Sequence, residues 1–377
     1  MKKTNIVEYI RNNCNRYSKT EMATHLGITR DKVRRLMQQH KISGEKTLDA
    51  DIEHIHFEKD QNDIRKKFRE LLNRYEISEK EKQALLEIKK TARPHVIKTR
   101  NSKGTGEATA VIVASDWHIE EEVAFSAVNG RNEFNLDIAR ARIDEFFSHS
   151  LKLLKKEQGA IKIDNVILAL LGDFISGNIH EELLESCSLR PIEAILTAKD
   201  WLISGIQFLL DNTDCDFTIV CTVGNHTRIT KHVHIAQERG NNLEYFMYHV
   251  MESYFRDNKR VHFVIEDSYH TYLTVYNQTI RFHHGHAIKY GGGVGGLTIP
   301  VNKAIAQWNK TRNADLDVFG HWHQQFDGGN FLCNGSLIGY NAFALFIKAG
   351  FEAPKQLFFL IDKKRSKTVV CPILFNR

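Results

Sequence analysis

Seven side chains with oxygen or imidazole donors lie in five short, widely separated stretches of the chain, and they are the residues best suited to chemistry. They are Asp116, His118, Asp173, Asn225, His284, His321 and His323. Carboxylate and amide oxygens together with neutral imidazole nitrogens form a donor set that divalent metal ions prefer. No cysteine belongs to the set. The set is large enough for two such ions, which would support metal-assisted hydrolysis.

Each of these stretches follows an apolar run that predicts a β-strand. The runs cover residues 110–114, 166–171, 217–223, 279–282 and 316–319. Most of the intervening segments are long enough for the crossover helix that parallel strands require. Because open α/β sheets bind ligands beyond the carboxyl ends of their strands, we expect the donors to gather at one sheet edge.

Further elements follow from the same patterns of apolar residues. Helical spacing predicts helices over residues 136–155, 191–210 and 243–255. Short apolar runs after His226 predict strands that we expect to be antiparallel. These runs cover residues 262–266, 271–276, 279–282, 331–333 and 356–361. The chain is therefore predicted to be an α/β protein over most of its length.

The order of the donor motifs resembles a known family. The motifs are Asp116-Trp117-His118, Gly172-Asp173, Gly224-Asn225-His226, His284-Gly285-His286 and Gly320-His321-Trp322-His323. In this order they resemble the calcineurin-like metallophosphoesterase superfamily, over roughly residues 109–340. The resemblance implies a four-layer αββα sandwich, in which two β-sheets face each other with helices outside, and a dinuclear metal centre.

The resemblance also implies a role for each donor. The ligands of a first metal would be Asp116, His118 and His323, and Asp173 would bridge both ions. The second site would be completed by Asn225, His284 and His321. A bridging carboxylate offsets the repulsion between two close dications, and a hydroxide that bridges them would attack phosphorus. Manganese is the expected metal, while iron, zinc and nickel also suit these donors.

Three residues near the ligands are candidates for catalysis and substrate binding. His226 corresponds to the family histidine that protonates the leaving group or stabilises the transition state. The family usually has an acidic residue next, but this chain has Thr227, so another group would have to orient the ring. Arg228 could bind the substrate phosphate through two donors, and His286 is a second candidate for substrate contact because it lies next to His284 in its motif.

The first 43 residues predict a helix-turn-helix DNA-binding domain. Ser18 and Glu21 form a capping-box pattern, Gly27 suits a tight turn between helices, and Thr29 suits the start of the next helix. The outward face of that last helix is basic and is expected to contact DNA. Its candidate DNA-binding residues are Arg30, Lys32, Arg34 and Arg35. A small helical module for protein interaction is the alternative.

Residues 44–107 predict a charged helical arm and linker, and residues 108–377 the metallophosphoesterase domain. The arm carries one apolar stripe, from Ile64 to Tyr75, and together with the helix-turn-helix it is compatible with a homodimer. The net charge of +6 arises from the first 107 residues, since the remainder is slightly acidic. A basic front end suggests a polyanionic partner.

The composition bears on where in the cell the protein is expected to be. Six cysteines without paired spacing favour a reducing compartment. No apolar run reaches the roughly 18 residues of a membrane span, and the N-terminus lacks the apolar core of a secretory signal. We therefore expect no membrane partner and a cytoplasmic location in a bacterial or phage-infected cell. The architecture also resembles phosphoesterases encoded by bacteriophages.

These observations support one leading function and two alternatives. The leading hypothesis is a nuclease that hydrolyses phosphodiester bonds of DNA and is targeted by the helix-turn-helix. The first alternative is a metal-dependent phosphomonoesterase acting on a nucleotide, a DNA end or a protein. The second is a DNA-binding regulatory protein whose metal centre serves structure only.

Overall fold

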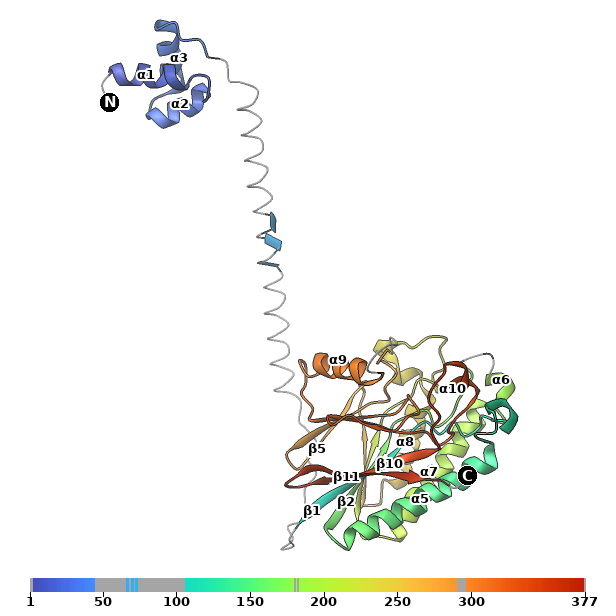
Figure 1. The fold of residues 1–377 in the computed structure, drawn as a ribbon. Coiled ribbons are helices and arrows are strands. Elements are labelled where there is room, and N and C mark those ends of the chain that lie inside the picture. Colours follow the sequence, from blue (N-terminus) through green and yellow to red (C-terminus); the bar gives the residue numbers. More distant parts are fainter. Residues whose placement is uncertain are drawn as a thin grey trace. The chain divides into compact units, whose positions relative to one another are not determined.

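The structure of the chain is a computed structural model that describes residues 3–44, 66–67, 69–70, 72–73, 106–179, 181, 183–289 and 296–375. The chain divides into two compact units, Met1–Thr91 and Ala92–Arg377. Figure 1 labels the helices and strands of both units. The predicted arm and linker at 44–107 lie almost entirely outside the described residues, so their helical character stays a prediction.

Three helices form the described core of the first unit. They are α1 (Lys3–Asn13), α2 (Lys19–Leu26) and α3 (Arg30–Gln39). The predicted capping box is confirmed, because Ser18 and Glu21 exchange side-chain to backbone hydrogen bonds. Gly27 is left-handed at φ 61°, and the Thr29 hydroxyl accepts from the Lys32 backbone N–H. Apolar side chains of all three helices share one small core, with Ile10, Met22 and Val33 among them.

The second unit contains a six-stranded sheet with the strand order β11-β10-β1-β2-β3-β4. Its strands are β1 (Glu107–Ala114), β2 (Lys162–Leu170), β3 (Asp216–Cys221), β4 (Val261–Ile265), β10 (Lys355–Asp362) and β11 (Ser366–Leu374). The first four are parallel to one another, whereas β10 pairs antiparallel with β1 and with β11. The ends of β1, β2 and β3 therefore lie at the same edge.

A second, five-stranded sheet has the order β5-β6-β7-β9-β8. Its strands are β5 (Thr271–Val275), β6 (Gln278–Phe282), β7 (Leu316–Phe319), β8 (Phe326–Asp327) and β9 (Phe331–Cys333). The central strands β6, β7 and β9 are parallel, and β5 and β8 pair antiparallel at the two edges. The carboxyl ends of β6 and β7 therefore also lie together.

The expectation of antiparallel strands after His226 was wrong for β4 and only partly right for β6 and β9, since β6 is antiparallel to β5 but parallel to β7. The strand β4 follows α8 (Leu243–Phe255), a crossover helix, and pairs parallel with β3. The strand β9 is parallel to β7 and antiparallel only to the two-residue β8. Short apolar runs do not reveal strand direction, which depends on the path of the connecting chain.

Helices cover the outer faces of both sheets (Figure 1). The longer helices of the second unit are α5 (Leu136–Gln158), α7 (Pro191–Asp211), α8 and α9 (Thr298–Trp308). The shorter ones are η1 (Phe125–Val128), α6 (Leu183–Ser186), η2 (Ile235–Gln237), η3 (Arg239–Asn241) and α10 (Ala342–Phe346). The three predicted helices agree with α5, α7 and α8.

Alternate residues of the strands separate the layers. In β1, Ala110 and Ile112 pack toward α5, α7 and α8, while Val111 and Val113 pack against the second sheet. On the far side of the second sheet, Phe319 and Phe331 contact the buried face of α9. This succession of helices, sheet, sheet and helix confirms the layers of the predicted αββα sandwich.

None of the helices in the described part of the chain combines the length and the apolar character that crossing a membrane requires.

Candidate metal centre

The loops that follow β1, β2 and β3 are joined by backbone contacts at the edge of the six-stranded sheet. The N–H of Asp116 donates to the Gly172 carbonyl at 3.0 Å, and that of Trp117 donates to the Asp173 carbonyl at 2.8 Å. A Cβ on Gly172 would lie 2.2 Å from the Gly224 nitrogen, and a Cβ on Gly224 would lie 2.0 Å from Asp173 Oδ1. Only glycine allows these loops to approach so closely.

Five of the seven predicted ligands adopt left-handed backbone conformations. They are Asp116 (φ 55°), His118 (49°), Asp173 (55°), His321 (71°) and His323 (53°). Such conformations cost non-glycine residues about 1–3 kcal/mol each and concentrate at functional sites. The bends at His321 and His323 also allow both rings of this segment to reach the same centre.

The first predicted ligand group is brought together from two loops, the one after β1 and the one after β7. Nε2 of His323 lies 3.4 Å from Asp116 Oδ1 and 3.3 Å from Nε2 of His118. The donor atoms of these three residues all lie within 4.8 Å of one another. The Asp116 carboxylate is held by the backbone N–H of His321, at 2.9 and 3.0 Å, and by the Ser115 hydroxyl at 2.5 Å.

The second predicted group lies beside the first. Nε2 of His284 is 2.8 Å from Asp173 Oδ2 and 3.3 Å from Nδ1 of His321, and the three donors again lie within 4.8 Å of one another. Asn225 supplies the most specific indication of an ion. Its Oδ1 is buried and has no hydrogen-bond partner in the part of the chain that the structure describes. A buried acceptor is normally satisfied, so a cation is the expected partner.

Hydrogen bonds fix which nitrogen two of the histidines would offer to an ion. Ser176 Oγ donates to Glu121 Oε2 at 2.9 Å and therefore accepts from Nδ1–H of His118, also at 2.9 Å. Nδ1–H of His284 donates to the Leu171 carbonyl at 2.7 Å. In both rings Nε2 is therefore the nitrogen that faces the other ligands and that would bind an ion. Such bonds to the remote nitrogen orient metal-binding histidines and increase their basicity.

The pKa values of the predicted ligands are shifted by burial and by one another. Burial, together with His226, holds the pKa of His118 well below its ordinary value. Burial also opposes the charged form of His284, but the Asp173 carboxylate outweighs it and raises the pKa of His284 to about 10. In return, His284 holds the pKa of Asp173 well below its usual range, against the effect of burial. A dication that bound here would replace the proton of His284.

His226, the predicted catalytic residue, lies between the two groups. Its donor atoms are within 4.8 Å of those of His118 and Asp173, and its backbone N–H donates to Asp173 Oδ1 at 2.8 Å. Nδ1 of the ring lies 2.9 Å from the Ser176 carbonyl oxygen and donates to it. Thr227 is buried, and its hydroxyl donates to Asn242 Oδ1 at 2.8 Å. The backbone carbonyl of Ser176 is therefore the group that orients the ring.

The two predicted substrate-binding residues, Arg228 and His286, lie near the ligands, and each already makes a polar contact with the protein. Arg228 donates through Nη1 to the Asn225 carbonyl at 2.6 Å, and its Nε is buried without a partner among the described residues. Nε2 of His286 lies 2.8 Å from Glu238 Oε1, and the centre of its ring is 5.6 Å from that of His284. His284, and not His286, is the residue placed with Asp173 and His321.

Sequence reasoning missed Glu244, a buried carboxylate on α8 that connects two ligand loops. Its Oε1 accepts from the Phe174 backbone N–H at 2.8 Å, and its Oε2 accepts from that of Gly224 at 2.7 Å. Asn242 assists, because its Nδ2 donates to the Gly224 carbonyl at 2.8 Å. Burial and the negative charge of Asp173 raise the pKa of Glu244 to about 8. Nothing in the local sequence distinguishes Glu244 from a solvated acid at a helix start.

Glu120 was also missed, and it organises the turn after Asp173. Its Oε1 accepts from the backbone N–H groups of Ser176 and Gly177, both at 2.8 Å. Burial raises the pKa of Glu120 to about 7. Because Ser176 also contacts His118 and His226, Glu120 indirectly positions a predicted ligand and the predicted catalytic histidine.

The candidate DNA-binding residues belong to the first unit. Arg30, Lys32, Arg34 and Arg35 are all exposed on α3. The opposite face of this helix is buried through Val33 and Met37, so α3 presents a basic surface to solvent. That arrangement is required for phosphate contact but is not specific to it.

Comparison with known proteins gives only remote similarity. A scan against protein-family models produced no match, and neither did a search of curated protein sequences. Among solved structures, a hypothetical protein from Pyrococcus horikoshii aligns with 71% of this chain and 89% of its own, at 12% identity and a TM-score of 0.35. A single mutant of Vps29 from Entamoeba histolytica covers 71% and 99%, at 12% identity and a TM-score of 0.27.

A putative 5′-nucleotidase from Staphylococcus aureus also aligns. It matches 72% of this chain and 55% of its own, at 10% identity and a TM-score of 0.28. Scores of this size carry no functional argument, so the description of the site rests on the chain's own residues.

Proposed function

We propose that the protein is a dinuclear-metal phosphoesterase that hydrolyses phosphodiester bonds of DNA. The observation that carries this proposal is the convergence of two groups of donors from strand-end loops, together with the Oδ1 of Asn225, which is buried and has no partner among the described residues. The donors have the types and the mutual distances that two divalent ions require. Their order along the chain, which resembles the calcineurin-like metallophosphoesterases, supports the same chemistry.

In this proposal each ion has its own ligands and shares one. Asp116, His118 and His323 would hold one ion. Asn225, His284 and His321 would hold the other, and Asp173 would contact both. Manganese suits this mixture, as do iron, zinc and nickel. When bound, such ions polarise a phosphoryl oxygen and lower the pKa of bound water.

His226 is proposed to supply the proton that the leaving oxygen needs. The Ser176 carbonyl occupies Nδ1–H, so the proton for transfer would reside on Nε2. The contact between the His226 backbone N–H and Asp173 keeps the ring next to both ligand groups. Leaving-group protonation of this kind typically contributes a factor of about 100 to 10,000 in rate.

DNA is favoured as the substrate because of the first unit. The exposed basic residues of α3 would neutralise backbone phosphates, and the excess of positive charge in residues 1–107 would add to the attraction. Under this proposal the helical unit binds the polymer and the metal centre cleaves it. Arg228, beside Asn225, is proposed to contact the scissile phosphate.

The test compares hydrolysis and binding in the same variants. Purified protein with Mn²⁺ should cleave single-stranded or plasmid DNA, and Asp173→Asn should abolish cleavage while DNA binding stays unchanged. Asp200→Asn, at an exposed position of α7, is the matched control and should retain full activity. Rapid hydrolysis of 4-nitrophenyl phosphate without any DNA cleavage would refute the nuclease proposal and favour a phosphomonoesterase.

A further inference from the structure

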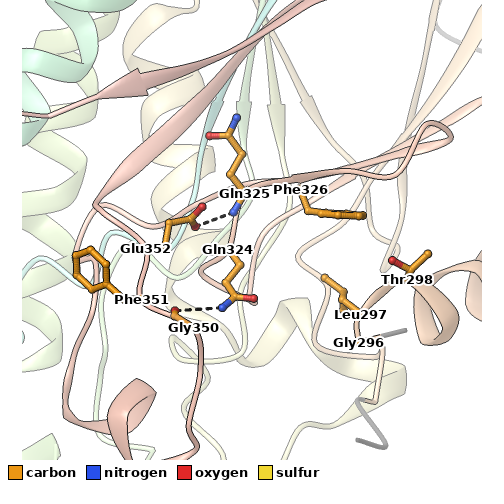
Figure 2. A pocket seen from close by; sticks show the side chains of 9 residues that line it. All are labelled: Gly296, Leu297, Thr298, Gln324, Gln325, Phe326, Gly350, Phe351 and Glu352. Atoms are coloured by element: carbon orange, nitrogen blue, oxygen red, sulfur yellow. Dashed lines mark hydrogen bonds between the residues drawn. The ribbon is translucent and has the colours of Figure 1, made fainter. Parts of the chain in front are cut away.

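A hollow of about 330 Å³ lies beside the loop that carries His321 and His323. Figure 2 shows the nine residues that line it. They are Gly296, Leu297, Thr298, Gln324, Gln325, Phe326, Gly350, Phe351 and Glu352. Its volume is at the lower end of the range for small-molecule sites, roughly 300–1,000 Å³, so it suits a single ring system.

Both sides of this hollow are connected to the candidate metal centre. On one side, Gln324 directly follows His323 in the chain. The opposite side follows α10, whose N-cap residue Asn341 donates to Glu121 Oε1 at 2.9 Å. Glu121 is the carboxylate whose contact with a serine hydroxyl helps to orient His118. A ligand in the hollow would therefore contact Gln324, the residue that directly follows a predicted metal ligand.

Two phenyl rings, Phe326 and Phe351, are the most prominent apolar groups of the lining. Their exposed fractions are 43% and 46%, which is high for phenylalanine. Phe326 is backed by Phe331, with ring centres 5.7 Å apart, and Phe351 is backed by Tyr340 at 5.6 Å and by the Arg131 guanidinium at 5.5 Å. Rings that are supported on one side and exposed on the other can act as stacking platforms for a flat ligand.

The polar groups of the lining suit hydrogen bonding better than the binding of charge. Glu352 is neutralised by Lys355, whose Nζ lies 2.8 Å from Oε1, and its Oε2 accepts from the Gln325 backbone N–H at 2.8 Å. The Gln324 amide is held in place by the Gly350 carbonyl. Neither lysine nor arginine occurs among the nine described lining residues, so the lining itself offers no cation to a phosphate.

We propose that this hollow binds the nucleobase of a nucleotide whose phosphate lies at the metal centre. A base has flat apolar faces for Phe326 and Phe351 and edge groups for the amide of Gln324 and the hydroxyl of Thr298. The inference rests on the proposed phosphoesterase function and adds a substrate-recognition site to it. It assigns base binding to the second unit alone, independently of the helices at the N-terminus.

The test measures whether loss of a ring weakens recognition of a base-containing substrate only. The substrates are the 4-nitrophenyl ester of thymidine 5′-phosphate and methyl 4-nitrophenyl phosphate, which has no base. We expect Phe326→Ala and Phe351→Ala to raise KM for the thymidine ester about tenfold, which corresponds to the loss of one stacking contact. The kcat for this ester and both constants for the methyl ester should change by less than about twofold.

Further variants separate stacking from folding. Phe326→Leu and Phe351→Leu keep apolar bulk but remove the aromatic face, and they should show the same selective rise in KM. Phe246→Ala, at a 66% exposed position of α8, removes a ring that is not in the lining and should leave every constant unchanged. Equal effects of the alanine variants on both esters, or no effect on either, would overturn the inference.

A binding measurement distinguishes failure of this inference from failure of the proposed function. If wild-type protein with Mn²⁺ hydrolyses neither ester, the proposed function fails, and saturation-transfer NMR with thymidine still tests the hollow. Signals from thymine protons that disappear in Phe326→Ala would support base binding, and identical signals in both proteins would overturn it. A single-stranded oligothymidylate, used beside the mononucleotide ester, shows whether the base comes from a strand. If the alanine variants differ from the wild type in KM for either substrate, the inference is supported. If they match the wild type with both substrates, it is overturned.

Discussion

Replacement of Glu244 by glutamine should disturb the metal centre without touching any predicted ligand. Glu244 uses both carboxylate oxygens, one for the Phe174 backbone N–H and one for that of Gly224. These residues immediately follow Asp173 and precede Asn225. Glutamine preserves the volume of the side chain but replaces one acceptor with an amide donor, so one of the two backbone N–H groups must lose its bond.

The size of the effect follows from these contacts. A buried donor left without a partner costs about 1–3 kcal/mol, and Glu244 is fully buried. The free energy of unfolding should therefore fall by about this amount. Partners that orient metal ligands typically contribute about 10–100-fold in metal affinity, so the Kd for Mn²⁺ should rise by a similar factor.

Denaturant unfolding and calorimetric titration with Mn²⁺ measure the two quantities independently. Glu252→Gln is the matched control, because Glu252 lies on the same helix but is half exposed and forms an ion pair with the similarly exposed His249. This control should change stability by less than about 0.5 kcal/mol and leave the metal affinity unchanged. Addition of Mn²⁺ should also stabilise the wild type more than the Glu244 variant.

The reasoning would be refuted if the Glu244 variant bound Mn²⁺ within about twofold of the wild type while losing the expected stability. That result would show that Glu244 supports the fold but does not position Asp173 and Asn225. If neither stability nor affinity changed, the two backbone contacts would not be present in solution.

Three further predictions concern pH, backbone packing and DNA. Because the pKa of His284 is raised to about 10, its ring is protonated at neutral pH and must lose a proton to bind Mn²⁺. Mn²⁺ affinity, measured by calorimetric titration, should therefore increase about tenfold for each unit by which the pH is raised, up to about pH 10. An affinity that stays constant from about pH 6.5 to 8.5 would contradict this. In Gly224→Ala the new Cβ would lie 2.0 Å from a carboxylate oxygen of Asp173, so the free energy of unfolding, measured by denaturant melts, should fall by at least about 1–3 kcal/mol. In the control Gly240→Ala the new Cβ would have no neighbour within 4 Å, and stability should be nearly unchanged. Replacement of both Arg34 and Arg35 by alanine should reduce the slope of log K against log salt for duplex DNA by about 0.9 per lost phosphate contact, measured by fluorescence anisotropy, and an unchanged slope would argue for the protein-interaction alternative.

Much of the architecture could be predicted from the sequence, because the relevant signals are local. Helical periodicity predicted α8 at residues 243–255, and the Ser18–Glu21 pattern predicted the capping box. Donors placed after apolar runs predicted that their loops would meet, although the structure draws these loops from the strand ends of two sheets and not of one. These inferences need only the neighbours of a residue along the chain.

Only the tertiary structure decided how the loops are aimed and held. It places Nε2 of His284 toward Asp173, assigns the Ser176 carbonyl to His226, and shows Glu244 joining two loops. The parallel direction of β4 was likewise visible only in the folded structure. Each of them depends on a contact between groups far apart in the chain, and only the packing of the sheets and helices determines such contacts.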